Sequence, residues 1–232
     1  MKAIGDDIWR VSGPDFPLLG GARLPVASTI VRLPDRTVLV YAPVAFDDAT
    51  VDGIAQLGEV AHVVAPNLLH HRFVGDALAR WPRAALHAPA GLAAKRSDLP
   101  AARPLPEGDA SWRASLEVIS LAGAPKLDET VLFHRPSATL ICADLVFHVT
   151  EPPNLRTRLV LAAMGTGGGK LAQSRAWNTL AKDRSLLRPA LERVLALPIA
   201  QVAPCHGPHL AIDAASLAPV LARAYGGVPG VT

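Results

Sequence analysis

Cysteine is scarce in this 232-residue sequence, which contains only Cys142 and Cys205. Two cysteines do not make a disulfide framework, and reduced thiols in a cytoplasmic protein are the simpler interpretation. An excess of one charge is missing as well, because 23 Lys and Arg against 20 Asp and Glu leave a formal charge of +3. The basic residues are scattered along the chain, so we expect no nucleic-acid partner.

Long hydrophobic runs are also lacking. Stretches such as 139–142 and 200–204 are far shorter than the roughly 20 residues needed to cross a bilayer. Asp6 and Asp7 stand where a signal peptide would be apolar. These features predict a cytoplasmic location and no membrane partner. Half of the residues are nevertheless hydrophobic, enough for a substantial core, and we expect one folded domain over residues 1–232.

Short β-rich runs alternate with longer helical patterns, which is typical of an α/β protein. We expect two αβ halves that join near residues 98–110, a proline-containing stretch. Residues 151–170, with two prolines and three consecutive glycines, predict a mobile loop or lid. Strands are predicted at 29–33, 37–41, 60–65, 85–87, 116–121, 130–134, 139–142 and 200–204, and helices at 47–57, 73–81, 90–95, 183–197 and 214–225.

Potential ligand-binding residues follow three of these strands. His70 and His71 come after the strand at 60–65, Asp144 after the strand at 139–142, and His206 after the strand at 200–204. Ligand sites of α/β sheets gather at strand ends, because the loops converge there while the strands fix their positions. We therefore expect these side chains to meet.

Two segments, Ala143-Asp144-Leu145-Val146-Phe147 and Ala203-Pro204-Cys205-His206-Gly207, together with the histidine-containing loop 66–71 after an apolar strand, resemble the metallo-β-lactamase-like superfamily. Within it, the chain is most similar to a branch of uncharacterised proteins whose loop reads like Pro66-Asn67-Leu68-Leu69-His70-His71. The resemblance implies a four-layer αβ/βα sandwich and metal-dependent hydrolysis.

The metal-binding signature of that superfamily is degenerate in this chain. Its His-x-His-x-Asp-His motif, placed without gaps from Asn67, falls on Asn67, Leu69, His71 and Arg72. Leucine cannot bind a metal, and a dication repels arginine. The further histidine of the superfamily would fall within 121–126, which contains none. The sequence therefore predicts at most a mononuclear site.

One such site would combine an imidazole of His70 or His71, with His71 slightly favoured, the carboxylate of Asp144 and the imidazole of His206. Two histidines and one carboxylate suit one Zn or Fe ion with open positions. A metal ion can lower the pKa of bound water toward about 7. Hydrolysis of an ester, thioester, amide or phosphoester by Asp144, His206 and this ion is then the expected activity, with an unknown small molecule as substrate.

Each of these residues also has a structural interpretation. Asp144 could cap a turn, and His206 could donate to a nearby carbonyl. In a metal-free alternative, Arg72 or Lys126 neutralises Asp144, and the pocket binds a small anion or metabolite without catalysis. Lys126, Asp128 and Glu129 are otherwise expected in a solvated loop.

Further residues are assigned as follows. Asn67, Glu129 and His148 are additional pocket candidates. His62, His87, His134 and His209 have no supporting constellation and are expected to be structural. The alanine-rich helix that ends at Tyr225 leaves a homo-oligomer open as a third possibility.

Overall fold

The first sheet of the computed structural model, which describes residues 1–105 and 108–228, has seven strands. Antiparallel pairing at one side of the sheet gives way to parallel pairing from β6 onward. The predicted hairpin at 29–41 is confirmed as the β5–β6 pair, in which Thr29 lies opposite Tyr41. The spatial order is β1 (Lys2–Gly5), β2 (Ile8–Ser12), β5 (Ala27–Arg32), β6 (Val38–Tyr41), β7 (Val60–Val64), β8 (Ala85–Ala88) and β9 (Arg103–Pro104).

A second sheet of five strands follows in the second half of the chain. Its strands β12 and β13 are parallel neighbours, although 58 residues separate Cys142 from Gln201. This pairing brings the segments after Cys142 and Pro204 to the same edge. The order is β10 (Leu116–Ser120), β11 (Thr130–His134), β12 (Thr139–Cys142), β13 (Gln201–Pro204) and β14 (Leu210–Ala211).

The two sheets face each other across a shared core. Leu39 and Tyr41 of β6 and Leu132 and Ile141 of the second sheet are fully buried in it. Val38 and Val40 alternate with them and point to the opposite face of the first sheet, as the period of a strand requires. Each sheet thus has an inner and an outer apolar face, which explains the unbroken hydrophobic runs in these strands.

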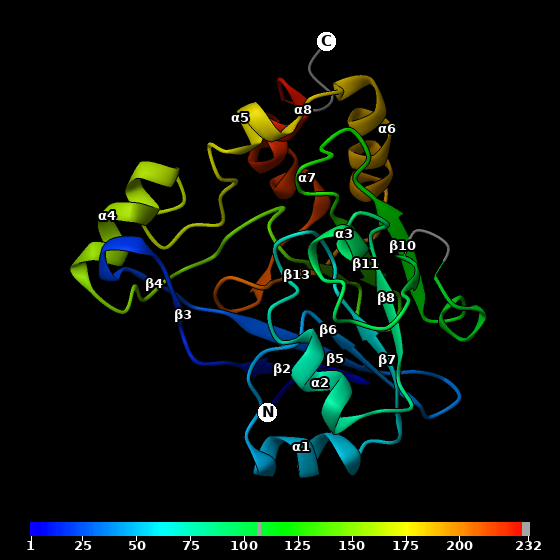
Figure 1. Cartoon of the computed structure of the whole chain (residues 1–232). Helices are drawn as coiled ribbons and strands as arrows, with labels where there is room; N and C mark the ends of the chain where they lie inside the picture. The colour runs from blue at the N-terminus through cyan, green and yellow to red at the C-terminus, as the bar shows by residue number, and fades with distance from the viewer. Residues whose placement is uncertain (106–107, 229–232) are drawn as a thin grey trace.

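Helices cover both outer faces and complete the predicted four-layer αβ/βα sandwich (Figure 1). On the first sheet lie α1 (Asp48–Ala55), α2 (Val74–Arg80) and α3 (Leu92–Lys95). On the second lie α5 (Trp177–Leu180), α6 (Arg184–Leu195), α7 (Ala214–Leu217) and α8 (Ala222–Tyr225). A 3-10 turn at Ala218–Leu221 separates α7 from α8, so the predicted single helix at 214–225 is wrong in detail, and Pro219, which has no N–H to donate, lies in this turn.

Asp47 and Asp183 fix the starts of two of these helices. The Asp47 carboxylate accepts the N–H of Thr50, and that of Asp183 accepts the N–H of Ser185. Each occupies the position before the first helical residue, where a short acidic side chain satisfies a free donor and complements the helix dipole.

The prediction of an irregular mobile loop over 151–170 is wrong, because α4 (Leu155–Met164) lies within it. Asn154 caps this helix, and Gly165, at φ 75°, ends it. Only Thr157 and Leu161 of α4 are buried, while Leu155 and Leu159 are exposed, so no amphipathic pattern marks the helix in the sequence. In Figure 1, α4 projects to one side together with the short hairpin of β3 (Phe16–Pro17) and β4 (Arg23–Leu24).

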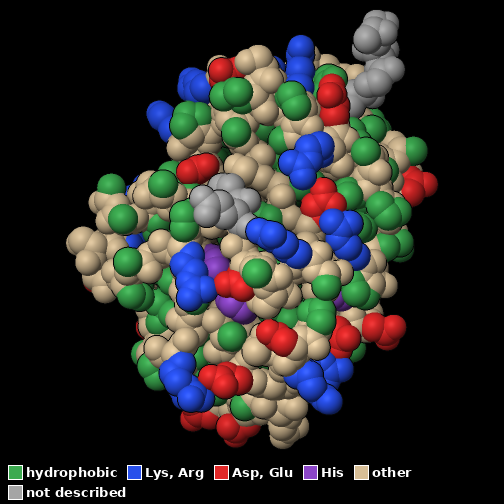
Figure 2. All heavy atoms as spheres, turned by 90° about the vertical axis from the view of Figure 1, so that its right-hand side faces the viewer, with side chains coloured by type: hydrophobic (Ala, Val, Ile, Leu, Met, Phe, Trp, Pro, Cys, Tyr) green, Lys and Arg blue, Asp and Glu red, His purple; other side chains and the backbone are tan. Residues whose placement is uncertain are grey.

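The expected junction at 98–110 runs from the end of the first sheet toward the second. Its β9 strand pairs with β8, and a 3-10 turn at Ala110–Trp112 follows. Residues 106–107 of the junction lie outside the described part of the chain. No helix in the described ranges is long and apolar enough to span a membrane. On the face in Figure 2, basic and acidic side chains are interspersed.

A candidate metal centre

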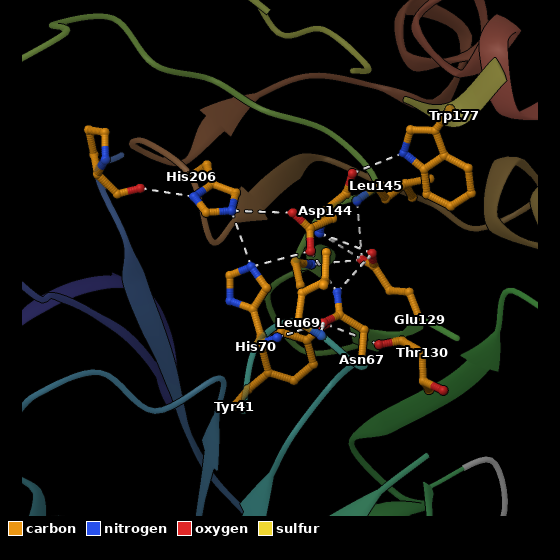
Figure 3. A network of polar contacts seen from close by, with 12 residues as sticks. Tyr41, Asn67, Leu69, His70, Glu129, Thr130, Asp144, Leu145, Trp177 and His206 are labelled. Atoms are coloured by element: carbon orange, nitrogen blue, oxygen red, sulfur yellow. Dashed lines mark hydrogen bonds and ion pairs between the residues drawn. The ribbon is translucent and has the colours of Figure 1, made fainter. Parts of the chain in front are cut away.

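Three side chains from three strand-end loops meet at one edge of the two sheets (Figure 3). His70 follows β7, Asp144 follows β12 and His206 follows β13. The Nε2 atoms of the two histidines are 3.1 Å apart, and each lies 3.3 Å from one Asp144 oxygen. One ligand atom of each residue lies within 4.8 Å of the others. The sequence predicted this convergence for Asp144 and His206.

Asn67 determines which of the two adjacent histidines enters the site. Its side-chain oxygen accepts the N–H groups of Leu69 (2.9 Å) and His70 (2.8 Å), which tightens the loop into an Asx-type turn. Leu69 is left 57% exposed, and His70 turns inward. His71 contacts the Arg96 side chain instead. The slight preference for His71 is therefore wrong, because gapless counting does not account for this turn.

His206 is held by contacts on both sides of its ring. Its Nδ1–H donates to the carbonyl of Pro25 (3.0 Å), and the Phe147 ring stacks on it at 4.6 Å between centroids. Because a carbonyl only accepts, the proton of a neutral His206 ring is on Nδ1, and Nε2 carries a lone pair. That lone pair faces the Asp144 oxygen at 3.3 Å.

Two acceptors that face each other at this distance need a proton or a cation between them. The 3.1 Å separation of the histidine nitrogens lets both bind one ion at about 2.0–2.1 Å. A carbonyl that fixes the outer nitrogen of a histidine is also the usual support for a metal ligand. The donor set of His70, Asp144 and His206 therefore fits one transition-metal ion.

Glu129, predicted in a solvated loop, is in fact fully buried directly behind Asp144. Its carboxylate accepts the backbone N–H groups of Ala143 (2.8 Å), Asp144 (3.0 Å) and Leu145 (3.2 Å). It thus binds the turn that follows β12, and it accepts a longer contact of 3.4 Å from the Asn67 amide. Asn67 donates more closely to Asp144, at 2.8 Å. Asn67 and Glu129 hence join the site as supports of Asp144.

Asp144 itself is anchored at both ends. Its side chain receives the Asn67 amide and faces the two histidines, and its backbone carbonyl accepts the indole N–H of Trp177 at 3.0 Å (Figure 3). No helix begins here in the described chain, so the carboxylate is not an N-cap.

Burial and charge shift the acid–base behaviour of this cluster in opposite directions. Burial raises the pKa of Glu129, and the neighbouring Asp144 charge adds to this, bringing it to about 7. Burial alone would raise the pKa of Asp144 too, but the neighbouring His70 and His206 side chains lower it strongly. Burial would lower the pKa of His70, yet the Asp144 carboxylate raises it well above its ordinary value. Asp144 is therefore ionised near neutral pH.

The remaining predicted site residues lie around this cluster. His148 is buried, is not one of the two histidines paired with Asp144, and binds the carbonyl of Pro208 through Nδ1. Arg72 lies over the rings of Phe16 and Phe73, and Lys126 is exposed. Among the described residues, neither Arg72 nor Lys126 forms an ion pair with Asp144. No contact here supports their predicted neutralising role.

A cavity of about 270 Å³ opens onto the three side chains. Most of its wall is apolar and comes from the β3–β4 hairpin and the residues after it, the segment after β6 and the loop that contains His70. The open side of the candidate centre therefore faces a chamber in which a substrate could displace water.

A second cluster, missed from the sequence, lies between the sheets at β7 and β8. His62 Nδ1 is 3.1 Å from His87 Nε2, and Asp109 is near enough to share an ion with them. Neighbouring parallel strands place these histidines on one face, two residues apart in register, a signal that the sequence carried. In the structure, both Asp109 oxygens already accept hydrogen bonds, one from Arg103 and the other from Ser111.

Comparison with solved structures identifies the class. Over 97% of this chain and 94% of the other, the fold superposes on the DIM-1 metallo-β-lactamase with a TM-score of 0.64 at 14% identity. A metallo-β-lactamase from Pontibacter korlensis gives 0.58 at 16% identity over 99% and 98% of the chains. The metal-soaked Flv1 flavodiiron core from Synechocystis gives 0.62 at 13% over 96% and 59%. The protein has the metallo-β-lactamase-like fold.

Within that class, the sequence itself identifies the family. The model of a domain of unknown function, DUF4336, matches residues 17–180, and the chain belongs to this family. A comparison with curated protein sequences finds no match. The matched range contains His70 and Asp144 but ends before His206.

Proposed function

We propose that the protein is a hydrolase that uses one transition-metal dication, Zn²⁺ or Fe²⁺, held by His70, Asp144 and His206. The observation that carries the proposal is the facing of the His206 lone pair and the Asp144 oxygen, with His70 Nε2 3.1 Å from His206 Nε2. The fold supports it, since the metallo-β-lactamase and flavodiiron structures share this architecture.

Several residues of the chain have distinct roles at such a centre. When bound, a dication there acts as a Lewis acid and makes water nucleophilic near neutral pH. Asn67 and Glu129 hold Asp144 in place, and Pro25 keeps the Nδ1 proton of His206 away from the centre. The apolar walls of the cavity exclude bulk water from the carbonyl of a bound ester or thioester.

Metal analysis of protein purified without chelators tests the proposal first. We expect close to one Zn or Fe ion per chain, lost in His206→Ala and retained in the matched control His71→Ala. Hydrolysis of small esters and thioesters should follow the same pattern. Protein that neither carries nor takes up Zn²⁺, Fe²⁺ or Mn²⁺ would refute the metal-dependent function.

A metal-free binding protein is the second candidate, and one contact pattern favours it. Asp144 already has two histidine partners, so its charge can be compensated without Arg72, Lys126 or an ion. On this alternative, small anions raise the melting temperature and divalent cations do not, because only a ligand of the native state stabilises it. The hydrolase proposal instead predicts that Zn²⁺ raises the melting temperature.

A further inference from the structure

The cavity at the candidate centre combines a mainly apolar lining with one arginine. Its lining is mainly aliphatic and aromatic, with Phe16, Leu24, Val44 and Phe73 among the residues. Arg72 is the only Lys or Arg among the described residues that line it. At about 270 Å³ it is at or slightly below the usual size of a ligand pocket, so it suits a small molecule.

Arg72 is exposed, lies against two aromatic rings and has no acidic partner among the described residues. Its guanidinium carbon lies 5.4 Å from the ring centre of Phe16 and 5.8 Å from that of Phe73. Within the described chain it forms no ion pair, whereas Arg96 and Arg103 each bind an aspartate. Aromatic contacts restrict the side chain but leave its N–H donors unused, so a planar carboxylate could bind them in bidentate fashion.

Helix α4 packs against the β3–β4 hairpin, which forms one wall of the cavity, and it fixes the position of this wall. The Thr157 hydroxyl of α4 donates to the carbonyl of Arg23 (2.9 Å) and accepts the N–H of the same residue (2.8 Å). Leu161 of α4 packs in one buried cluster with Leu24 and Phe147. Leu24 thus lies between α4 and the cavity, and Phe147 between α4 and the ring of His206.

From this arrangement we infer that the site takes a small ester or thioester with an apolar body and a second, carboxylate end. The apolar body fills the chamber under the β3–β4 hairpin, the carboxylate binds Arg72, and the reactive carbonyl reaches His70, Asp144 and His206. The carbonyl part of this inference rests on the proposed hydrolase function. The inference that the ligand combines an apolar body with a carboxylate does not rest on that function.

Binding of two matched, unreactive probes tests the pocket by itself. 4-Phenylbutanoate and 4-phenylbutanamide have the same apolar body and differ in the charge of one end. We expect the unmodified protein to bind the carboxylate about tenfold more tightly by calorimetry, with and without added Zn²⁺. In Arg72→Gln this preference should vanish, and in the exposed control Arg113→Gln it should persist.

A second variant tests the chamber. Val44→Trp should abolish binding of both probes, because it fills the apolar volume while leaving Arg72 unchanged; its fold is checked by circular dichroism. A preference for the carboxylate that survives Arg72→Gln would overturn the inference, since the anion would then bind the centre itself. Undiminished binding to a folded Val44→Trp protein would overturn it as well.

Turnover separates this inference from the proposed function. 4-Nitrophenyl esters of glutaric and pentanoic acids have acyl chains of equal length, and only the first ends in a carboxylate. We expect kcat/KM to favour the glutarate ester about tenfold, through KM, and Arg72→Gln to remove the difference. If the probes bind as expected but neither ester is cleaved, the hydrolase proposal fails and the binding pocket stands.

Discussion

The buried carboxylate of Glu129 lies directly behind Asp144 and accepts its backbone N–H at 3.0 Å. Two further N–H groups, from Ala143 and Leu145, converge on the same carboxylate. One acidic side chain therefore sets the turn from which another projects toward His70 and His206. The geometry of the candidate centre depends on a residue that does not itself face the cavity.

Replacing Glu129 with glutamine should loosen this turn. Glutamine offers one acceptor oxygen and turns an NH₂ group toward backbone donors, so Glu129→Gln should cost about 1–3 kcal/mol of unfolding free energy in urea. Because Asp144 loses its support, zinc affinity should fall roughly 10- to 100-fold. The exposed Glu151→Gln serves as control. Unchanged zinc affinity in Glu129→Gln would contradict the supporting role.

The two adjacent histidines should differ sharply in their effect on the centre. His70→Ala removes a nitrogen 3.1 Å from His206 Nε2, whereas His71→Ala removes a ring that contacts Arg96 outside the site. We expect metal content and metal-induced stabilisation to be lost only in His70→Ala. Equal losses in both variants would mean that the loop 67–71 rearranges on metal binding.

His70 and His71 show which feature of the site could not be predicted from the sequence. Strand periodicity located the sheets, and the strand-end rule brought Asp144 and His206 together correctly. The choice between His70 and His71 depended on the side chain of Asn67 bending the backbone, which spacing along the sequence does not encode. Local side-chain hydrogen bonds of this kind are decided only in the folded loop.

Glu129 and α4 were mispredicted for related reasons. A glutamate one residue before a strand is usually solvated, and only the approach of the 143–145 turn supplies the donors that bury it. Helix α4 buries just Thr157 and Leu161 against the β3–β4 hairpin and the residues around it, so its pattern resembles that of an irregular segment. Both depend on contacts between residues distant in sequence.

The hydroxyl of Thr157 should support the cavity wall that the β3–β4 hairpin forms. Thr157→Val keeps the volume but removes both hydrogen bonds to Arg23, and we expect a loss of about 1–2 kcal/mol in unfolding free energy. Thr157→Ser keeps the hydroxyl and should retain the bonds. Weaker binding of 4-phenylbutanoate in the valine variant alone would show that α4 braces the pocket.

Histidine 87 should make stability fall in mild acid. Burial lowers the pKa of His87 to about 4, with His62 and Arg103 acting in the same direction and Asp109 opposing them. Between about pH 6.5 and pH 4, this histidine is protonated in the unfolded chain, where its pKa is near the ordinary 6.5, but stays neutral in the folded chain. Stability is therefore fully present above about pH 6.5 and declines toward pH 4, by on the order of 2 kcal/mol at pH 5.

Urea unfolding of the protein and of His87→Gln at pH 7 and pH 5 measures this contribution. The variant loses the titrating ring, so its stability should change less between the two pH values, whatever its stability at pH 7. An identical change in both proteins would show that His87 takes up its proton in the folded state as readily as in the unfolded chain.

Asn67→Asp should make the protein more dependent on metal. The substituted side chain keeps an oxygen to accept the N–H groups of Leu69 and His70, so the turn and the position of His70 are retained. It replaces the NH₂ that donates to Asp144 at 2.8 Å with a second carboxylate oxygen, 3.4 Å or less from both acids of the site. Repulsion between carboxylates should destabilise the metal-free protein, and a dication should relieve it. We therefore expect a lower melting temperature without metal and a larger rise on adding Zn²⁺ than in the unmodified protein. A variant that is destabilised equally with and without Zn²⁺ would place the metal, if any, away from Asp144.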